Sequence, residues 1–116
     1  MSKSVNELAA DRNEMTKKGE IVQIAEKFFA PDGKTFDFEG GTKDRAELVG
    51  KMKSFLGSIA KVNGITFHRA SVSGDVSFAE FTFDFDMKDG SKIYWHEIIR
   101  SMWKNGQIVE EQYFKA

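Results

Sequence analysis

The stretch VSFAEFTFDFDM, residues 76–87, alternates apolar and polar side chains. Its odd positions from Ala79 to Phe85 hold one alanine and three phenylalanines, whereas its even positions from Glu80 to Asp86 are all polar. A period of two is that of a β-strand, whose successive side chains point to opposite faces. The phenylalanine face must therefore be buried, and this strand is predicted to lie against a core.

Turn signals on both sides of this strand indicate an antiparallel meander. SGD at 73–75, KDG at 88–90 and NG at 105–106 divide the chain after residue 65 into four strands. Connections this short join antiparallel neighbours. The second half of the chain is therefore predicted to be a β-meander.

The first half is predicted to be mainly helical. Ser4 is a suitable N-cap for a first helix, and a second helix is expected over residues 20–29. A short strand is expected in KTFDFEGG, residues 34–41. Asp44 and Glu47 resemble a capping box at the start of a third helix that would end near Asn63-Gly64. Helices followed by a meander predict an α+β domain with the helices packed on one sheet face.

The NG turn predicts which face each residue of the last hairpin occupies. A two-residue turn pairs Lys104 with Gln107, and counting back places Arg100 opposite Glu111. A cross-strand ion pair belongs in solvent, so these two residues are assigned to the outer face. The positions assigned to the inner face are Trp95, Glu97, Ile99, Ser101, Trp103, Glu110 and Gln112.

The KDG turn leaves two registers open. A two-residue turn and a type I turn with a glycine bulge differ by one residue, and this exchanges His96 and Glu97 between the faces. The bulged form places Phe83 beside Trp95 and Phe81 beside Glu97, in agreement with the last hairpin. We therefore prefer the register in which Glu97 faces inward.

A two-residue turn in SGD places His68 opposite Phe81, on the inner face. A histidine titrates near neutral pH, and burial keeps a glutamate such as Glu97 partly protonated, so the two are candidates for acid/base roles. The alternative for each is structural: a core histidine with a hydrogen bond, and a carboxyl that partners it. Several polar groups on one core face suggest a cavity between sheet and helices.

Composition argues against several other functions. Seventeen basic and eighteen acidic residues give a net charge of -1, which provides no electrostatic case for binding nucleic acid or a membrane. The absence of cysteine excludes disulfides and thiolate chemistry, and HEIIR lacks the second histidine of HExxH, so no metal site or cofactor is expected. The polar N-terminus and the lack of a long apolar window predict a cytoplasmic protein.

The order of elements and three motifs resemble the SnoaL-like branch of the NTF2-like superfamily over essentially the whole chain. KKGEIVQIAEKFFAPD is similar to the family's second helix, SGDVSFAEFTFDF to its alternating strand, and MWKNGQIVEEQYF to its closing hairpin. The resemblance implies one α+β domain over residues 1–116, a cone-shaped barrel with a pocket between the concave sheet and the helices. The family includes polyketide cyclases, a ketosteroid isomerase, dehydratases, epoxide hydrolases and non-catalytic binding domains, so the fold alone does not decide the function.

The sequence thus predicts a small-molecule pocket protein of the SnoaL-like type that binds an apolar cyclic or aromatic ligand. If it is catalytic, we expect cofactor-free proton transfer of the isomerase, cyclase or dehydratase type, with His68, Glu97 and Glu110 as acid/base candidates. The resemblance places Asp37 and Glu39 where isomerase-like members carry an Asp, and Glu110 or Glu111 near the acid/base of cyclase-like members. The expected pocket lining is Asp37, Glu39, Phe55, Phe81, Phe83, Trp95, Ser101, Trp103 and Gln112.

The alternative function is a non-catalytic, dimeric binding or interaction domain. Under that hypothesis the inner polar groups would satisfy one another and leave little open volume. Under either hypothesis the resemblance implies a homodimer, and we expect the outer sheet face to form it. The expected interface residues are Tyr94, Ile98, Met102 and Tyr113.

Overall fold

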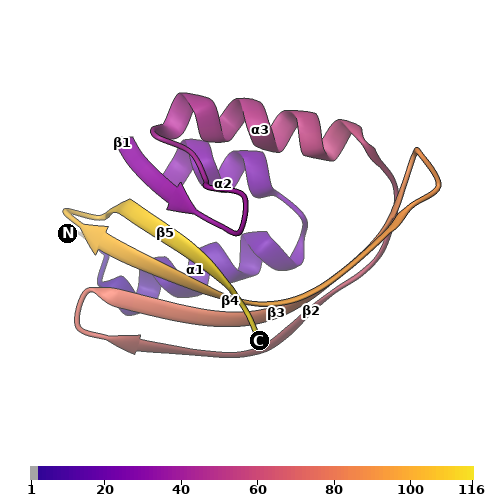
Figure 1. Cartoon of the computed structure of the whole chain (residues 1–116). Helices are drawn as coiled ribbons and strands as arrows, with labels where there is room; N and C mark the ends of the chain where they lie inside the picture. The colour runs from indigo at the N-terminus through magenta and orange to yellow at the C-terminus, as the bar shows by residue number, and fades with distance from the viewer. Residues whose placement is uncertain (1–2) are drawn as a thin grey trace.

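Three helices cover one face of a curved five-stranded sheet in the computed structural model, which describes residues 3–116 (Figure 1). The first two residues of the predicted domain lie outside this range. Strand order is β1-β5-β4-β3-β2, with β1 parallel to β5 and the other pairs antiparallel, so the sheet is mixed and open. The predicted α+β class is confirmed. The elements are α1 (Val5–Lys17), α2 (Ile21–Phe28), β1 (Phe29–Phe36), α3 (Arg45–Gly57), β2 (Ile59–Ser73), β3 (Val76–Met87), β4 (Lys92–Lys104) and β5 (Gln107–Lys115).

The predicted helix starts are confirmed. Ser4 caps α1, and it forms a complete capping box with Glu7. Asp44 caps α3 by accepting a hydrogen bond from the backbone N–H of Glu47 at 2.9 Å. These side chains satisfy backbone donors that have no partner within the helix. None of the described helices is both long and apolar enough to cross a bilayer.

The predicted end of α3 is wrong. The helix ends at Gly57, and β2 begins at Ile59, which pairs with Met87 at the far end of β3. The helical apolar spacing reaches only Ile59, and the Asn63-Gly64 pair that suggested a helix end lies within β2. Pairing with β3 along the whole of β2 supplies backbone hydrogen bonds, and this tertiary gain overrides the local pattern.

The predicted register between β3 and β4 is confirmed. Phe81 lies opposite Glu97 and Phe83 lies opposite Trp95. Gly90 adopts a φ of 90° in the connecting turn, as a glycine bulge requires. Glu97 therefore faces the helices.

A β-bulge in β2 overturns the predicted position of His68. Phe67, rather than His68, lies opposite Phe81, while Arg69 still lies opposite Glu80. His68 is the extra residue between these two pairs. A bulge of this kind turns two consecutive side chains to one face, so His68 joins Arg69 on the outer face of the sheet.

A second bulge, at Val109 in β5, reverses the predicted faces of the two glutamates that follow it. Beyond the bulge, Ser101 lies opposite Glu111 instead of Glu110. Glu111 is consequently buried, and Glu110 forms the outer ion pair with Arg100 at 3.3 Å. The predicted pair of Arg100 with Glu111 is therefore wrong.

The same bulge exchanges the next two residues of β5. Gln112 lies opposite Arg100 on the outer face, so its predicted place in the pocket lining is wrong. Tyr113 lies opposite Ile99 on the inner face, so its predicted place at an outer interface is wrong as well. Both errors follow from one inserted residue, because side chains alternate with a period of two.

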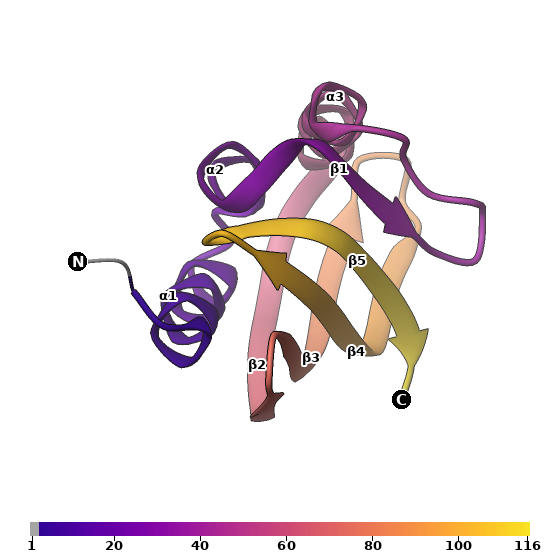
Figure 2. The same ribbon diagram turned by 90° about the vertical axis from the view of Figure 1, so that its left-hand side faces the viewer.

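The core consists of two clusters at the two ends of the concave sheet face, which curves around the helices in Figure 2. In the first, Phe28 of α2 meets Trp103 of β4 edge to face at 5.7 Å between ring centroids. Such edge-to-face contacts add to the stabilisation from burial. The first cluster comprises Ala9, Ile24, Ala25, Phe28, Phe29, Leu48, Trp103 and Ile108, and the second comprises Ala79, Phe81, Phe83, Phe85 and Ile99.

Two adjacent glycines in the loop after β1 provide a matched test of this fold. Both have positive φ, 121° at Gly40 and 107° at Gly41, but a Cβ on Gly41 would lie 1.9 Å from the carbonyl oxygen of Thr35, whereas one on Gly40 meets nothing within 4 Å. We expect Gly40→Ala to lower the free energy of unfolding by about 1 kcal/mol through backbone strain. Gly41→Ala should cost about 3 kcal/mol or more, because overlap adds to strain. Equal losses in urea denaturation would contradict this packing.

Candidate functional site

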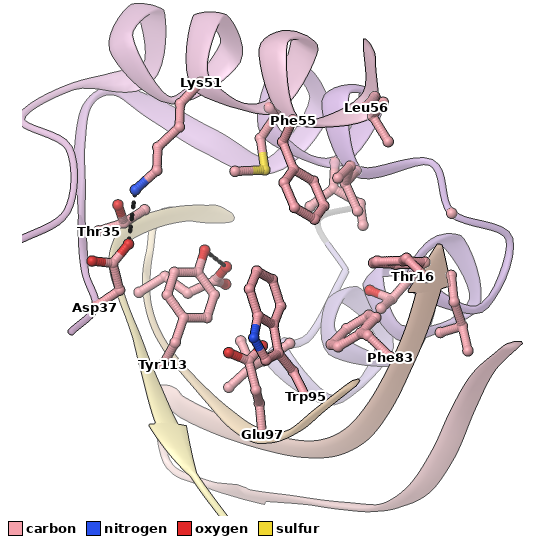
Figure 3. Close-up of a pocket in the computed structure, with 18 of the residues that line it drawn as sticks. Thr16, Thr35, Asp37, Lys51, Phe55, Leu56, Phe83, Trp95, Glu97 and Tyr113 are labelled. Carbon is pink, nitrogen blue, oxygen red and sulfur yellow. Dashed lines mark hydrogen bonds and ion pairs between the residues drawn. The ribbon is translucent and has the colours of Figure 1, made fainter. Parts of the chain in front are cut away.

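A cavity of about 740 Å³ lies between the inner face of the sheet and the helices (Figure 3). Helix α3 forms one wall with Phe55 and Leu56, and β4 forms the opposite wall with Trp95 and Glu97. Phe55 and Trp95 stack across it, with ring centroids 5.6 Å apart and an interplanar angle of 16°. The walls are largely apolar and aromatic, and a few polar groups converge in one region.

Glu97 is a half-buried carboxyl group in this cavity, and no described residue donates a hydrogen bond to its side chain or forms an ion pair with it. Burial, and then the negative charge of Asp37, raise its pKa from 4.5 to about 7. Each of these causes disfavours the charged form. At neutral pH Glu97 can therefore either donate or accept a proton.

A hydrogen-bonded network surrounds the second carboxyl group of the cavity. Glu111 is 1% exposed and accepts hydrogen bonds from Arg12 Nη2 at 2.5 Å, Ser101 Oγ at 2.6 Å and the Tyr113 hydroxyl at 2.7 Å. Arg12 also donates to Thr16 Oγ1 at 2.9 Å. Three donors make a buried carboxylate tolerable, so Glu111 is assigned as the ionised partner of Arg12.

Tyr113 is held as a neutral phenol. Burial, followed by the charge of Glu111, raises its pKa well above its usual range. Because its hydroxyl proton is donated to Glu111, the phenol oxygen can offer the cavity only an acceptor.

The third carboxyl group, Asp37, follows β1 at the edge of the cavity and is paired. Lys51 Nζ of α3 lies 2.8 Å from Asp37 Oδ2, and the backbone N–H of Glu39 donates to Oδ1 at 2.8 Å. Burial would raise the pKa of Asp37, but these two hydrogen bonds and the Lys51 charge outweigh it and lower the pKa. Asp37 therefore remains a carboxylate and contributes negative potential near Glu97.

The structure brings together only part of the predicted lining. Phe81 is fully buried, Ser101 is held by Glu111, and Trp103 donates its indole N–H to Ser77 Oγ at 2.9 Å in the core. These three residues therefore lie behind the cavity wall and do not line the cavity. The predicted residues that line the cavity are Asp37, Glu39, Phe55, Phe83, Trp95 and Glu97.

His68 lies outside the cavity, contrary to expectation. Its Nε2 atom is 2.7 Å from Thr82 Oγ1 on the outer face, and its ring lies 4.9 Å from that of His96. His96 in turn contacts Glu80 at 2.6 Å. The bulge in β2 places His68 among these outer residues, so the imidazole cannot serve a ligand in the cavity.

Several residues that shape the site escaped sequence reasoning, above all Arg12. Arg12 and Thr16 follow Ala9 at helical spacing and share its buried face of α1. An arginine on the buried face of an amphipathic helix signals a buried acidic partner, because such a charge is costly alone. The sequence contained that signal, but the signal did not identify Glu111 as the acidic partner. Among residues 3–116, no cluster of three or more histidine or carboxylate side chains could hold a metal ion.

The family model of the SnoaL-like domain matches residues 3–115. The chain belongs to the SnoaL-like domain family. A comparison with curated proteins finds no match for this SnoaL-like domain.

Solved structures share its fold along nearly the whole chain. A protein described as a SnoaL-like polyketide cyclase from Mesorhizobium loti is 26% identical, with a TM-score of 0.87 over 97% of this chain and 99% of that one. An NTF2-like protein of unknown function from Burkholderia pseudomallei is 14% identical, with a TM-score of 0.79 over 98% and 92%. A protein from Jannaschia, also described as a SnoaL-like polyketide cyclase, is 8% identical, with a TM-score of 0.77 over 98% and 90%. At such identities the similarity establishes the fold, and the chemistry has to be inferred from the residues of the site.

Removing one partner of the Arg12–Glu111 pair should destabilise the protein strongly. We expect Arg12→Met to lower the free energy of unfolding by about 3–5 kcal/mol, because it leaves the Glu111 carboxylate buried without a counter-ion. Adding Glu111→Met should recover part of that loss. Lys3→Met, just before the N-cap of the same helix, is the control: it breaks an exposed pair with Asp11 and should leave the stability nearly unchanged. Similar losses of unfolding free energy for Arg12→Met and Lys3→Met in urea denaturation would contradict the assignment.

The raised pKa of Glu97 predicts a pH dependence of stability. Between pH 4.5 and about 7 the folded protein keeps a proton on Glu97 that the unfolded chain releases, so stability should fall as pH rises through this window. After allowance for screening by solvent in the cavity, we expect a loss of about 1–2 kcal/mol. Glu97→Gln should lose this component, whereas Glu110→Gln on the outer face should keep it. The measurement is urea denaturation at a series of pH values, and superimposable profiles for wild type and Glu97→Gln would refute the prediction.

Proposed function

We propose that this SnoaL-like domain binds a flat, apolar cyclic or aromatic molecule in its cavity and that Glu97 transfers a proton to or from it without a cofactor. The observation that carries this proposal is the position of Glu97. It is a carboxyl group without a partner among the described residues, and it stands in an otherwise largely apolar cavity. Perturbed carboxyl groups in clefts are frequent at functional sites.

The size and walls of the cavity support the choice of ligand. Small-molecule pockets commonly measure about 300–1,000 Å³, and this cavity of 740 Å³ falls within that range. Phe55, Phe83 and Trp95 present aromatic surface to the interior, and flat rings of a ligand would stack against it.

The proton transfer is a cycle in which Glu97 ends as it began. In its carboxylate form, Glu97 takes a proton from a carbon next to a carbonyl group: the C–H bond breaks, an O–H bond forms on Glu97, and the electron pair moves to the carbonyl oxygen. Returning the proton to another carbon isomerises the substrate. Tyr113 cannot donate to the developing oxyanion, because its proton is held by Glu111. The substrate carbon must therefore be acidic already, or another donor must serve.

An open cavity favours this function over the interaction-domain alternative, under which the interior would be filled. A homodimer through the outer sheet face stays a prediction. Tyr94, Ile98 and Met102 lie on that face, with Tyr94 66% exposed.

The test is the exchange of carbon-bound hydrogen for deuterium in β-tetralone, a bicyclic ketone with an activated carbon, followed by proton NMR in D₂O. We expect the protein to accelerate exchange, with a rate that rises with pH through about 7 as Glu97 becomes a carboxylate. Glu97→Gln should lower the acceleration by on the order of 10²-fold or more. Glu110→Gln is the matched control and should leave it unchanged, because Glu110 pairs with Arg100 outside the cavity. Full exchange activity in Glu97→Gln would eliminate Glu97 as the base.

A further inference from the structure

Two tryptophans on β4 differ in what their indole N–H groups do. Trp103 donates to Ser77 Oγ at 2.9 Å and is 2% exposed in the core. Trp95 lines the cavity, is 43% exposed, and donates to no described residue. A tryptophan usually finds a hydrogen-bond partner for its N–H when the ring is buried. A ligand that covered Trp95 would therefore have to supply that partner or leave the N–H unsatisfied.

The ring of Trp95 is held in a defined orientation. It stacks on Phe55 of α3 at 5.6 Å with an interplanar angle of 16°, and it lies opposite Phe83 on β3. In Figure 3 the Trp95 ring stands between β4 and α3 with Glu97 beside it on the same strand. The stacking contact restricts rotation of the ring, so the donor is partly oriented before any ligand arrives, as stabilisation of a developing charge requires.

Trp95 and Glu97 are two residues apart on the inner face of β4, so their backbone positions are about 6.6–7 Å apart. Neither side chain bonds to the other, and the pKa of Glu97 is raised by burial and Asp37, with no lowering by a donor. The interval can accommodate a carbonyl oxygen next to the indole and the adjacent C–H next to the carboxylate. The cavity thus offers a base and a donor on one strand for the two atoms whose charges change when a ketone becomes an enolate.

We propose that the Trp95 indole N–H donates a hydrogen bond to the carbonyl oxygen of a flat cyclic ketone, while Glu97 faces the adjacent carbon. This inference rests on the proposed function and deepens it by assigning the donor that binds the carbonyl oxygen. In the reaction the C–H bond breaks, the proton passes to Glu97, and the electron pair becomes the enolate whose oxygen is held by Trp95. Trp95 then supplies the donor that Tyr113, committed to Glu111, cannot supply.

The test compares β-tetralone with tetralin, which has the same fused ring system without the carbonyl group. In ¹⁵N-labelled wild-type protein, the indole N–H signals of Trp95 and Trp103 are assigned with Trp95→Phe. We expect β-tetralone to move the Trp95 proton downfield beyond any shift with tetralin, because ring currents act in both complexes and the hydrogen bond in only one. The Trp103 signal is the internal control and should stay in place with both ligands.

The variant Trp95→Phe keeps an aromatic ring for Phe55 and removes the donor together with part of the apolar contact area, and a comparison with tetralin corrects for the lost area. We expect its affinity for β-tetralone to fall about three- to tenfold more than its affinity for tetralin, because the lost contact area affects both ligands and the lost hydrogen bond affects only the ketone. Its rate of hydrogen exchange should fall by on the order of 10²-fold. Equal Trp95 shifts with both ligands, or equal affinity losses for ketone and hydrocarbon in the variant, would overturn the role of Trp95 while leaving cavity binding intact. Failure of both ligands to bind wild-type protein would instead overturn the proposed function, and this inference with it.

Discussion

The buried ion pair between Arg12 and Glu111 joins the first helix to the last strand, and the arrangement of the site depends on it. Two charges removed from water cost several kcal/mol each, and mutual pairing together with further hydrogen bonds offsets that cost, although Nε of Arg12 has no hydrogen-bond partner among the described residues. Ser101 and Tyr113 complete the set around Glu111. The pair exists because the bulge at Val109 turns Glu111 inward. A straight β5 would send this carboxyl to solvent and leave the arginine buried without a counter-ion.

This pair also determines which polar groups remain free in the cavity. Glu111 is paired with Arg12 and accepts the hydrogen bond of the Tyr113 hydroxyl, and Asp37 is paired with Lys51. Glu97 is left as a half-buried carboxyl group without a partner among the described residues, under the negative potential of Asp37. The combination of paired and unpaired carboxyls in one apolar cavity is how a protein sets different protonation states for chemically similar groups.

Sequence reasoning was correct where strong local signals set the register. The caps at Ser4 and Asp44 act through contacts a few residues away and set the helix starts, whereas the NG turn and the bulged KDG turn set the register that placed Glu97 on the inner face. It was wrong at His68 and after Val109, where β-bulges occur without any turn residue in the sequence. A bulge allows a strand to bend within a curved sheet, and curvature is a property of the whole sheet. One inserted residue then moves every later side chain of the strand to the opposite face of the sheet from the one predicted.

By itself the sequence determined the order of helices and strands and the buried phenylalanine face of β3, and it favoured the inward position of Glu97. These depend on period, caps and turns, whose physical causes are local. Only the tertiary structure decided that Glu111, rather than Glu110, is buried, and that Arg12 is its partner. Residues 12 and 111 belong to opposite ends of the chain. Their contact depends on how a helix packs on a bulged strand, and no pattern within either segment contains that information.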